Sequence, residues 1–201
     1  RDPNFKWDWK VFREEKKKLK IDYPPEHVID KELVLKNLEK HKSDSYVMWL
    51  DHASFIIKLG DTTIITDPVF EKNYGPLFFG PKKFVDSPLS LKTLPKINLF
   101  LLSHNHYDHM SIRTIKNFPY KDAKVLVPLK LGRYFTRNGY KKDTVKEMDW
   151  FDKIKINDEI TITMLPSQHW SKRWIWGDGN TNRSLWGSFL IEYKDKKIFF
   201  A

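Results

Sequence analysis

Short runs of β-branched and aromatic residues dominate the chain from Tyr46 onward. The runs at 46–50, 55–59 and 62–66 are rich in Val, Ile, Thr and aromatic residues, a composition that favours strands. Gly60 and Asp61 separate the last two runs with a dipeptide typical of a hairpin turn. Further strands are predicted at 97–102, 125–127, 159–165, 188–193 and 197–200.

Helices are predicted between some of these strands, at about 31–40, 111–118 and 129–138. In the first of them Leu33, Leu35 and Leu38 are expected to face inward. Strands joined by hairpins and mixed with crossover helices predict an α/β or α+β sandwich.

The first 45 residues differ from the rest of the chain because they are charged, rich in aromatic residues and interrupted by Pro24 and Pro25. We interpret them as an N-terminal extension that packs on a domain formed by residues 46–201. The sequence contains no internal repeat and no low-complexity linker that would divide this domain.

A composition of 40% hydrophobic and 31% charged residues in 201 residues is that of a globular chain with a substantial core. No window approaches the roughly 18 uninterrupted apolar residues of a membrane span. Cysteine is absent, which excludes disulfides and thiolate metal ligands. The sequence begins with Arg1 rather than Met, so we expect that a preceding segment exists. Localisation stays open between cytoplasmic and peripheral membrane.

The net charge of +10 favours anionic partners such as phospholipid head groups, nucleic acid or small acidic substrates. A generally lysine-rich proteome would explain the same excess. The longest segment with a clear excess of positive charge is 121–155, which holds ten Lys or Arg residues and five acidic ones.

The segment after the predicted strand at 97–102 carries the most informative chemistry. His104, His106, Asp108 and His109 lie within six residues where the chain turns toward a helix. Neutral imidazole and carboxylate suit zinc or a similar divalent ion. Alternating residues project to one side, so His104 and His106 can share one ion, while Asp108 and His109 face a neighbouring position. Surface histidines in a polar loop are the weaker interpretation.

This His-x-His-x-Asp-His pattern resembles the signature of the metallo-β-lactamase superfamily, whose fold is an αββα sandwich. More narrowly, the chain resembles the branch that contains N-acyl-phosphatidylethanolamine-hydrolysing phospholipase D and its bacterial relatives. The narrower resemblance rests on MWLDHASFIIKLGDTTIITDPVF (48–70), FFGPKKF (78–84), LPKINLFLLSHNHYDHM (94–110), LPSQHWSKR (165–173) and NRSLWGSFLI (182–191).

The resemblance implies further site residues and a cofactor. His169 is implied as the third histidine of the first metal site, and Asp108 as a catalytic residue. Asp67 is implied as a carboxylate that orients a ligand imidazole, although a turn-forming Asp before Pro68 would look the same. The cofactor implied is zinc, as one or two divalent ions.

Two features stay open. His52 matches a Gly-His-Ala-Thr piece of the family, with Asp51 in place of Gly, and lies either near the pocket or in the packing at a strand end. Aromatic residues flank the site in sequence. They either pack in the core or form an apolar wall for a lipid. They comprise Trp170, Trp174, Trp176 and Trp186, and the loop with Phe78, Phe79, Lys82 and Lys83.

The resemblance also implies two metal ligands beyond Ala201, an aspartate shared by both ions and a later histidine. The second site is therefore expected to be incomplete in this sequence, which we interpret as a fragment lacking its C-terminal portion. Apolar surface left by such a fragment would need cover, so a homo-oligomer is one expectation.

The leading functional hypothesis is a phosphodiesterase that hydrolyses a phospholipid, with peripheral membrane contact. Alternatives are a small-substrate, lactonase-like hydrolase acting on another anionic molecule and a non-catalytic fragment. Nucleic acid is not among the expected partners because no RNA-binding module is recognisable.

Overall fold

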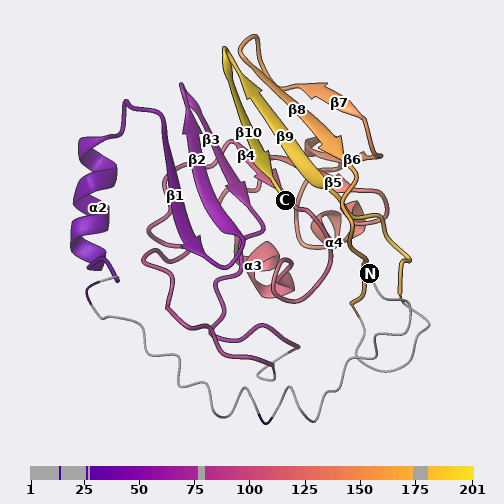
Figure 1. Ribbon diagram of the computed structural model, residues 1–201, viewed down its shortest axis with the longest axis horizontal. Coiled ribbons are helices and arrows are strands. Elements are labelled where there is room, and N and C mark those ends of the chain that lie inside the picture. The colour runs from indigo at the N-terminus through magenta and orange to yellow at the C-terminus, as the bar shows by residue number, and fades with distance from the viewer. Residues whose placement is uncertain (1–13, 15–25, 27, 77–79, 174–180) are drawn as a thin grey trace.

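Two β-sheets pack face to face in the computed structural model (Figure 1), which describes residues 14, 26, 28–76, 80–173 and 181–201. The larger sheet has six strands in chain order. The first three are antiparallel and the last three continue in parallel. These strands are β1 (Tyr46–Asp51), β2 (Ser54–Leu59), β3 (Thr62–Thr66), β4 (Leu99–Leu101), β5 (Lys124–Pro128) and β6 (Val145–Met148).

The smaller sheet is antiparallel throughout, in the order β10-β9-β8-β7. Its strands are β7 (Lys153–Lys155), β8 (Ile160–Leu165), β9 (Ser188–Tyr193) and β10 (Lys196–Phe200). Alternate residues of β8 are buried, as the period of two in a strand requires. The apolar side chains on this face form a core with one face of the larger sheet, including Ile57, Ile64, Leu99, Ile162 and Phe189.

The other face of the larger sheet packs against the helices α2 (Lys31–Lys40), α3 (Ile112–Asn117) and α4 (Gly132–Thr136). Phe100 lies at the centre of this second core, with its ring 5.2 Å from that of Phe118 and 5.0 Å from that of Phe135. A short 3₁₀ turn, Lys142–Thr144, precedes β6. No helix in the described part of the chain is long and apolar enough to cross a membrane.

The predicted mixed α/β sandwich is confirmed, and the hairpin at Gly60 is present with φ at +55°. The expectation for Leu33 was wrong, because this side chain is 49% exposed and its neighbour Val34 is buried. Asp30 caps the helix through the backbone N–H groups of Glu32 and Leu33. The inward face then comprises Val34, Leu35 and Leu38.

β6 and β7 were not predicted from the sequence. Both strands are short and lie at sheet edges, with one lysine in β6 and two in β7, so their apolar content is too low to mark them. Of the proposed N-terminal extension, α2 packs on the helix-side core, whereas Trp7, Trp9 and Phe12 lie outside the described residues. The boundary at residue 46 stays a prediction.

The arrangement of parallel strands determines where the site forms. Because β3 and β4 are parallel, Asp67 and Ser103 leave the sheet at the same edge. Gly187, just before β9, donates its N–H to the carbonyl of Ser103, which brings the smaller sheet to this edge. The segment after β8 that contains His169 therefore reaches the same place.

Candidate metal centre

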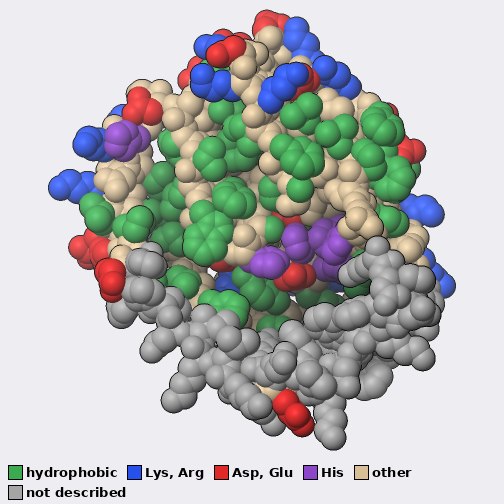
Figure 2. Space-filling view, in the orientation of Figure 1, with side chains coloured by type: hydrophobic (Ala, Val, Ile, Leu, Met, Phe, Trp, Pro, Cys, Tyr) green, Lys and Arg blue, Asp and Glu red, His purple; other side chains and the backbone are tan. Residues whose placement is uncertain are grey.

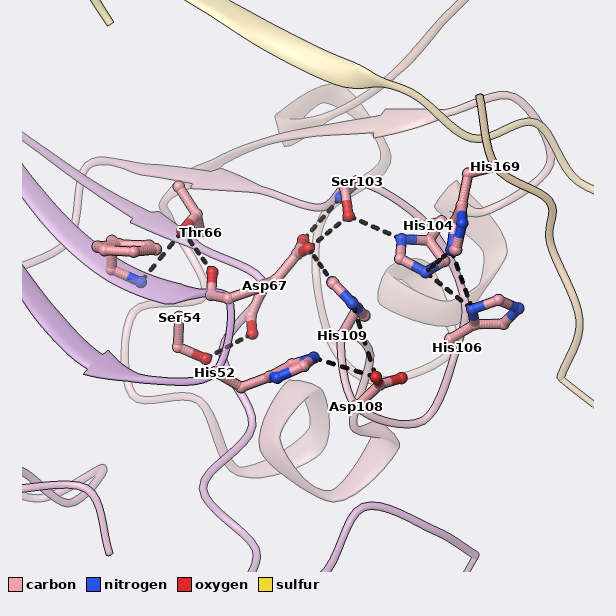
Figure 3. A network of polar contacts seen from close by, with 12 residues as sticks. His52, Ser54, Thr66, Asp67, Ser103, His104, His106, Asp108, His109 and His169 are labelled. Atoms are coloured by element: carbon pink, nitrogen blue, oxygen red, sulfur yellow. Dashed lines mark hydrogen bonds and ion pairs between the residues drawn. The ribbon is translucent and has the colours of Figure 1, made fainter. Parts of the chain in front are cut away.

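Five histidines and two aspartates from four segments meet at the edge of the sandwich (Figure 3). The loop after β4 contributes the His-x-His-x-Asp-His motif. The turn between β1 and β2 contributes His52, the end of β3 contributes Asp67, and the segment after β8 contributes His169. The structure thus brings together all seven residues that the sequence predicted for the site.

The first group consists of His104, His106 and His169. Nε2 of His104 lies 3.0 Å from Nδ1 of His106, and Nε2 of His169 lies 3.0 Å and 3.2 Å from these two atoms. Tetrahedral zinc with Zn–N bonds of about 2.0–2.1 Å would separate its nitrogen ligands by about 3.3 Å. The spacing in the first group is close to that value.

Hydrogen bonds alone cannot satisfy this triangle of nitrogens. Each nitrogen carries either a proton or a lone pair, so at least two of the three are alike and repel each other. A cation that accepts all three lone pairs removes the conflict. The donor set of the first group therefore fits a divalent ion.

Electrostatics keep these ligands neutral. Burial, followed by the charges of His109 and His106, lowers the pKa of His104 to about 2. Burial and the charge of His169 lower the pKa of His106 to about 4. Burial also lowers the pKa of His169. At neutral pH all three imidazoles therefore present the uncharged form that binds metal.

Asp67 fixes the orientation of two of the histidines. Its carboxylate, with no exposed surface, accepts the backbone N–H of Ser103 at 2.7 Å and the Ser103 hydroxyl proton. Ser103 Oγ must then accept from Nδ1 of His104, 2.9 Å away, which leaves Nε2 of His104 with its lone pair facing the first group. Asp67 Oδ2 also lies 2.7 Å from Nδ1 of His109. This is the arrangement expected of a carboxylate that orients metal ligands.

The second group consists of His52, Asp108 and His109. Oδ2 of Asp108 lies 3.0 Å from Nε2 of His52 and 3.8 Å from Nε2 of His109. Burial favours the neutral form of Asp108, but the hydrogen bond from His52 and the charge of His109 outweigh it and lower the pKa. Burial disfavours charge on His109, but Asp67 outweighs it and raises the pKa. The rings of His104 and His109 are 4.0 Å apart, so the two groups adjoin.

His52 is in the pocket rather than in strand-end packing. Its side chain is 42% exposed, and its ring lies 5.0 Å from that of His109. This position allows two roles, either supporting Asp108 by a hydrogen bond or binding an ion together with Asp108 and His109. The sequence alone did not distinguish His52 from a packing residue, because a lone His after a strand carries no spacing signal.

Asp51, where the family pattern has Gly, forms a buried ion pair with Lys83. Lys83 also donates to the carbonyl of Val69, and the Tyr74 hydroxyl lies 3.2 Å from Asp51 Oδ1. Of the two lysines singled out in this loop, Lys83 is therefore part of the packing, since its side chain is only 3% exposed. The pair links Val69 and Tyr74 beneath His52, whose ring lies 5.2 Å from that of Tyr74.

Arg173 is a supporting residue that the sequence analysis did not single out. Its Nη1 donates to the backbone carbonyls of Asn105, at 3.3 Å, and Met110, and its guanidinium lies 4.0 Å from the Tyr107 ring centroid. Arg173 thus braces the metal-binding loop from behind. Only the family resemblance, which covers Arg173 in LPSQHWSKR, could have drawn attention to it.

The tryptophans divide between the two roles considered for them. Trp170 is 45% exposed, with its ring 4.3 Å from that of His106, so it forms part of the pocket wall. Trp186 is half-buried and donates to the carbonyl of Ser167, which is a structural role. Trp174, Trp176, Phe78 and Phe79 lie outside the described residues.

A family model described as a β-lactamase superfamily domain matches residues 62–201. The chain belongs to this superfamily. N-acyl-phosphatidylethanolamine-hydrolysing phospholipase D from Saccharomyces cerevisiae is 33% identical over 81% of the chain and 34% of the relative. Phospholipase D 1 of the same type from Caenorhabditis elegans is 29% identical over 79% of the chain and 46% of the relative. The chain thus spans between a third and a half of these relatives.

Solved structures share the fold. A possible metal-dependent hydrolase from Veillonella parvula superposes with a TM-score of 0.58 at 18% identity. The superposition covers 79% of the chain described here and 62% of the Veillonella protein. A diiron β-hydroxylase from Streptomyces venezuelae superposes with a TM-score of 0.56 at 24% identity, over 79% and 29% of the two chains. The architecture is therefore that of metallo-β-lactamase folds.

Replacing His106 by Ala should abolish metal binding in the first group, because two nitrogens remain where three converge. Elemental analysis of the purified variant measures this directly. His41→Ala, at an exposed position outside the site, should keep the full metal content. Unchanged metal in His106→Ala would contradict the assignment.

Replacing Asp67 by Asn should lower metal affinity about 10–100-fold, because an amide is a weaker acceptor for the His109 and Ser103 protons. Competition with a chromophoric chelator measures the affinity. Asp61→Asn, in the exposed hairpin turn, is the matched control. An affinity equal to wild type in Asp67→Asn would leave Asp67 as a turn residue only.

Proposed function

We propose that this chain is the metal-binding portion of a metal-dependent hydrolase, a phosphodiesterase of the N-acyl-phosphatidylethanolamine phospholipase D type. The observation that carries the proposal is an apolar groove directly above the two metal-binding groups. The names of the yeast and nematode relatives support the same substrate class.

The groove has a volume of about 810 Å³ and contains His52, His106 and Asp108. Trp49, Phe84, Val85 and Trp170 give it apolar walls, and Lys82 adds a cation. Figure 2 shows hydrophobic side chains around the exposed histidines on this face. A substrate with an anionic phosphodiester and an apolar chain matches this lining, because the phosphate would lie over the histidines and the chain along the walls.

Zinc is the ion we propose, as one or two ions, because the donors are imidazoles and a carboxylate without thiolates. Bound there, it would supply Lewis-acid stabilisation of the phosphoryl oxygens and a water of lowered pKa. The first group would hold one ion through three histidines. Asp108, His109 and, as one possibility, His52 would contribute to a second.

The residues of the chain would then orient the reaction. Asp108 is ionised because its pKa is lowered, so it accepts a hydrogen bond from the attacking water and directs the oxygen toward phosphorus. His52 holds Asp108 in place through Oδ2. The water oxygen forms a bond to phosphorus, the bond from phosphorus to the N-acylethanolamine oxygen breaks, and the water proton ends on that leaving alcohol. Phosphatidic acid is the second product.

A substrate panel tests the proposal on the full-length protein. N-acyl-phosphatidylethanolamine should be hydrolysed, and Asp108→Asn should reduce kcat by at least about 100-fold, because the amide oxygen is a weaker acceptor for the water proton than the carboxylate. Asp61→Asn should leave kcat unchanged. Hydrolysis of lactones without hydrolysis of the phospholipid would favour the small-substrate alternative. A metal-loaded protein inactive on both would favour a non-catalytic role.

Contact with an anionic membrane surface is part of the proposal. The groove continues through Trp49 and Val85 into a second apolar groove of about 440 Å³ between α2 and β1, which includes Val28, Ile29 and Val47. Val47, Trp49 and Phe84 are each more than half exposed. Aromatic insertion at head-group depth together with the net charge of +10 would hold the substrate opening on the lipid.

Vesicle sedimentation tests this contact. Binding to anionic vesicles should fall with salt but keep a salt-resistant part, because screening weakens only the electrostatic attraction. Phe84→Ser should weaken binding about tenfold, whereas Phe199→Ser, equally exposed on the smaller sheet, should not. Protein that stays in the supernatant at low salt with lipid in excess would contradict membrane contact and leave the hydrolase proposal to the substrate panel.

A further inference from the structure

A second cavity lies behind the metal-binding loop. It has a volume of about 1160 Å³ and is bordered by α3, the turn from β5 into α4, and the segment before β9. Among the described residues it shares only Tyr107 and Arg173 with the groove above the metal-binding groups. None of the seven residues of the candidate metal centre lines it.

The charges around this cavity are mostly positive. Among the described residues its lining includes six cationic side chains, from Arg113, Lys116, Lys130, Arg133, Arg173 and Arg183, and one carboxylate, from Glu71. Glu71 accepts a hydrogen bond from the Thr114 hydroxyl at 3.2 Å. Lys116, Lys130, Arg133 and Arg183 form no ion pair with any carboxylate of the described residues. Like charges that surround one space raise the electrostatic potential in it, which favours an anion.

Two buried side chains of the lining each have one polar atom without a hydrogen-bond partner among the described residues. Asn105 and Ser184 are each 5% exposed, and the atoms are Oδ1 of Asn105 and Oγ of Ser184. A buried hydroxyl without a partner is costly, and such groups are normally satisfied by protein, water or ligand. Rotation of the Ser184 hydroxyl would provide a donor for an anionic oxygen in the cavity.

We infer that this cavity binds a multiply charged phosphate compound, with Lys116, Lys130, Arg133 and Arg183 as the charged contacts and Ser184 as a neutral donor. Arginine and lysine are the side chains that recognise phosphate oxygens. The four cations come from three separate segments, so a diphosphate or a phosphomonoester matches them better than a monoanion. The same chemistry is offered by a soluble phosphate compound and by the head group of an anionic lipid.

The site is independent of the hydrolase proposal, although Arg173 connects the two regions. Arg173 braces the carbonyls of the metal-binding loop on one side and lines the cavity on the other. An anion in the cavity would bring negative charge behind that loop, and the four cations would offset this charge. Binding itself, rather than activity, is therefore the informative measurement.

Isothermal titration of the metal-containing protein with inorganic pyrophosphate tests the inference. The double variant Lys130→Gln/Arg133→Gln should lose at least tenfold in affinity, and Ser184→Ala about tenfold, because each change removes a hydrogen bond to a charged group. The matched control is Lys141→Gln/Lys142→Gln, which removes the same charge from exposed residues outside the cavity. Thermal unfolding verifies that all variants are folded.

A parallel titration uses vesicles of phosphatidylcholine with and without phosphatidic acid. Loss of pyrophosphate binding in the cavity variants but not in the control supports a soluble ligand. If the cavity variants, but not the control, lose binding to phosphatidic acid vesicles while pyrophosphate does not bind, the ligand is a lipid head group. Equal pyrophosphate affinity in wild type, cavity variants and control would place the anion at the metal centre and overturn the inference, as would no binding of either probe.

Discussion

The buried carboxylate of Asp67 holds the parts of the site together. It accepts two hydrogen bonds from Ser103 and lies against His109, so one side chain at the end of β3 positions the loop that follows β4. Its own backbone has φ at +37°, a conformation that L residues rarely adopt. The surrounding contacts, including the Ser54 hydroxyl bonded to its carbonyl, maintain this geometry. A charge this deeply buried is tolerated only while these partners remain.

The two-sheet architecture provides the rigidity that such a site needs. Ile64 and Leu99 belong to the core between the sheets, whereas Ile65 and Phe100 belong to the core beneath the helices. β3 and β4 are therefore fixed from both faces, and the residues that follow them inherit a defined position. The loop itself is braced from behind by Arg173. The Asp51–Lys83 pair supports His52 through Tyr74. Ligands are thus carried by loops but held by buried partners, as a preorganised site requires.

The surroundings of the site differ on its two sides. The groove in front is mainly apolar, with Trp49, Phe84 and Trp170 exposed to solvent. The cavity behind is lined by cations. The net charge of +10 is therefore not spread evenly over this part of the molecule. We propose the front for a lipid chain with a phosphodiester and the back for a phosphate group alone.

Local sequence determined most of the strands and the His-x-His-x-Asp-His part of the site. Buried strands such as β3, β4 and β9 are rich in β-branched, aromatic or other apolar residues, and the His-x-His-x-Asp-His spacing is contained in one loop, so both were visible without a structure. The edge strands β6 and β7 were not, because they are short and contain few apolar residues. Only tertiary structure decided that His52 faces Asp108, that Lys83 is buried with Asp51, and that Arg173 braces the loop. These contacts join residues 30 or more positions apart, and their formation depends on how the sheets pack rather than on any local preference of the chain.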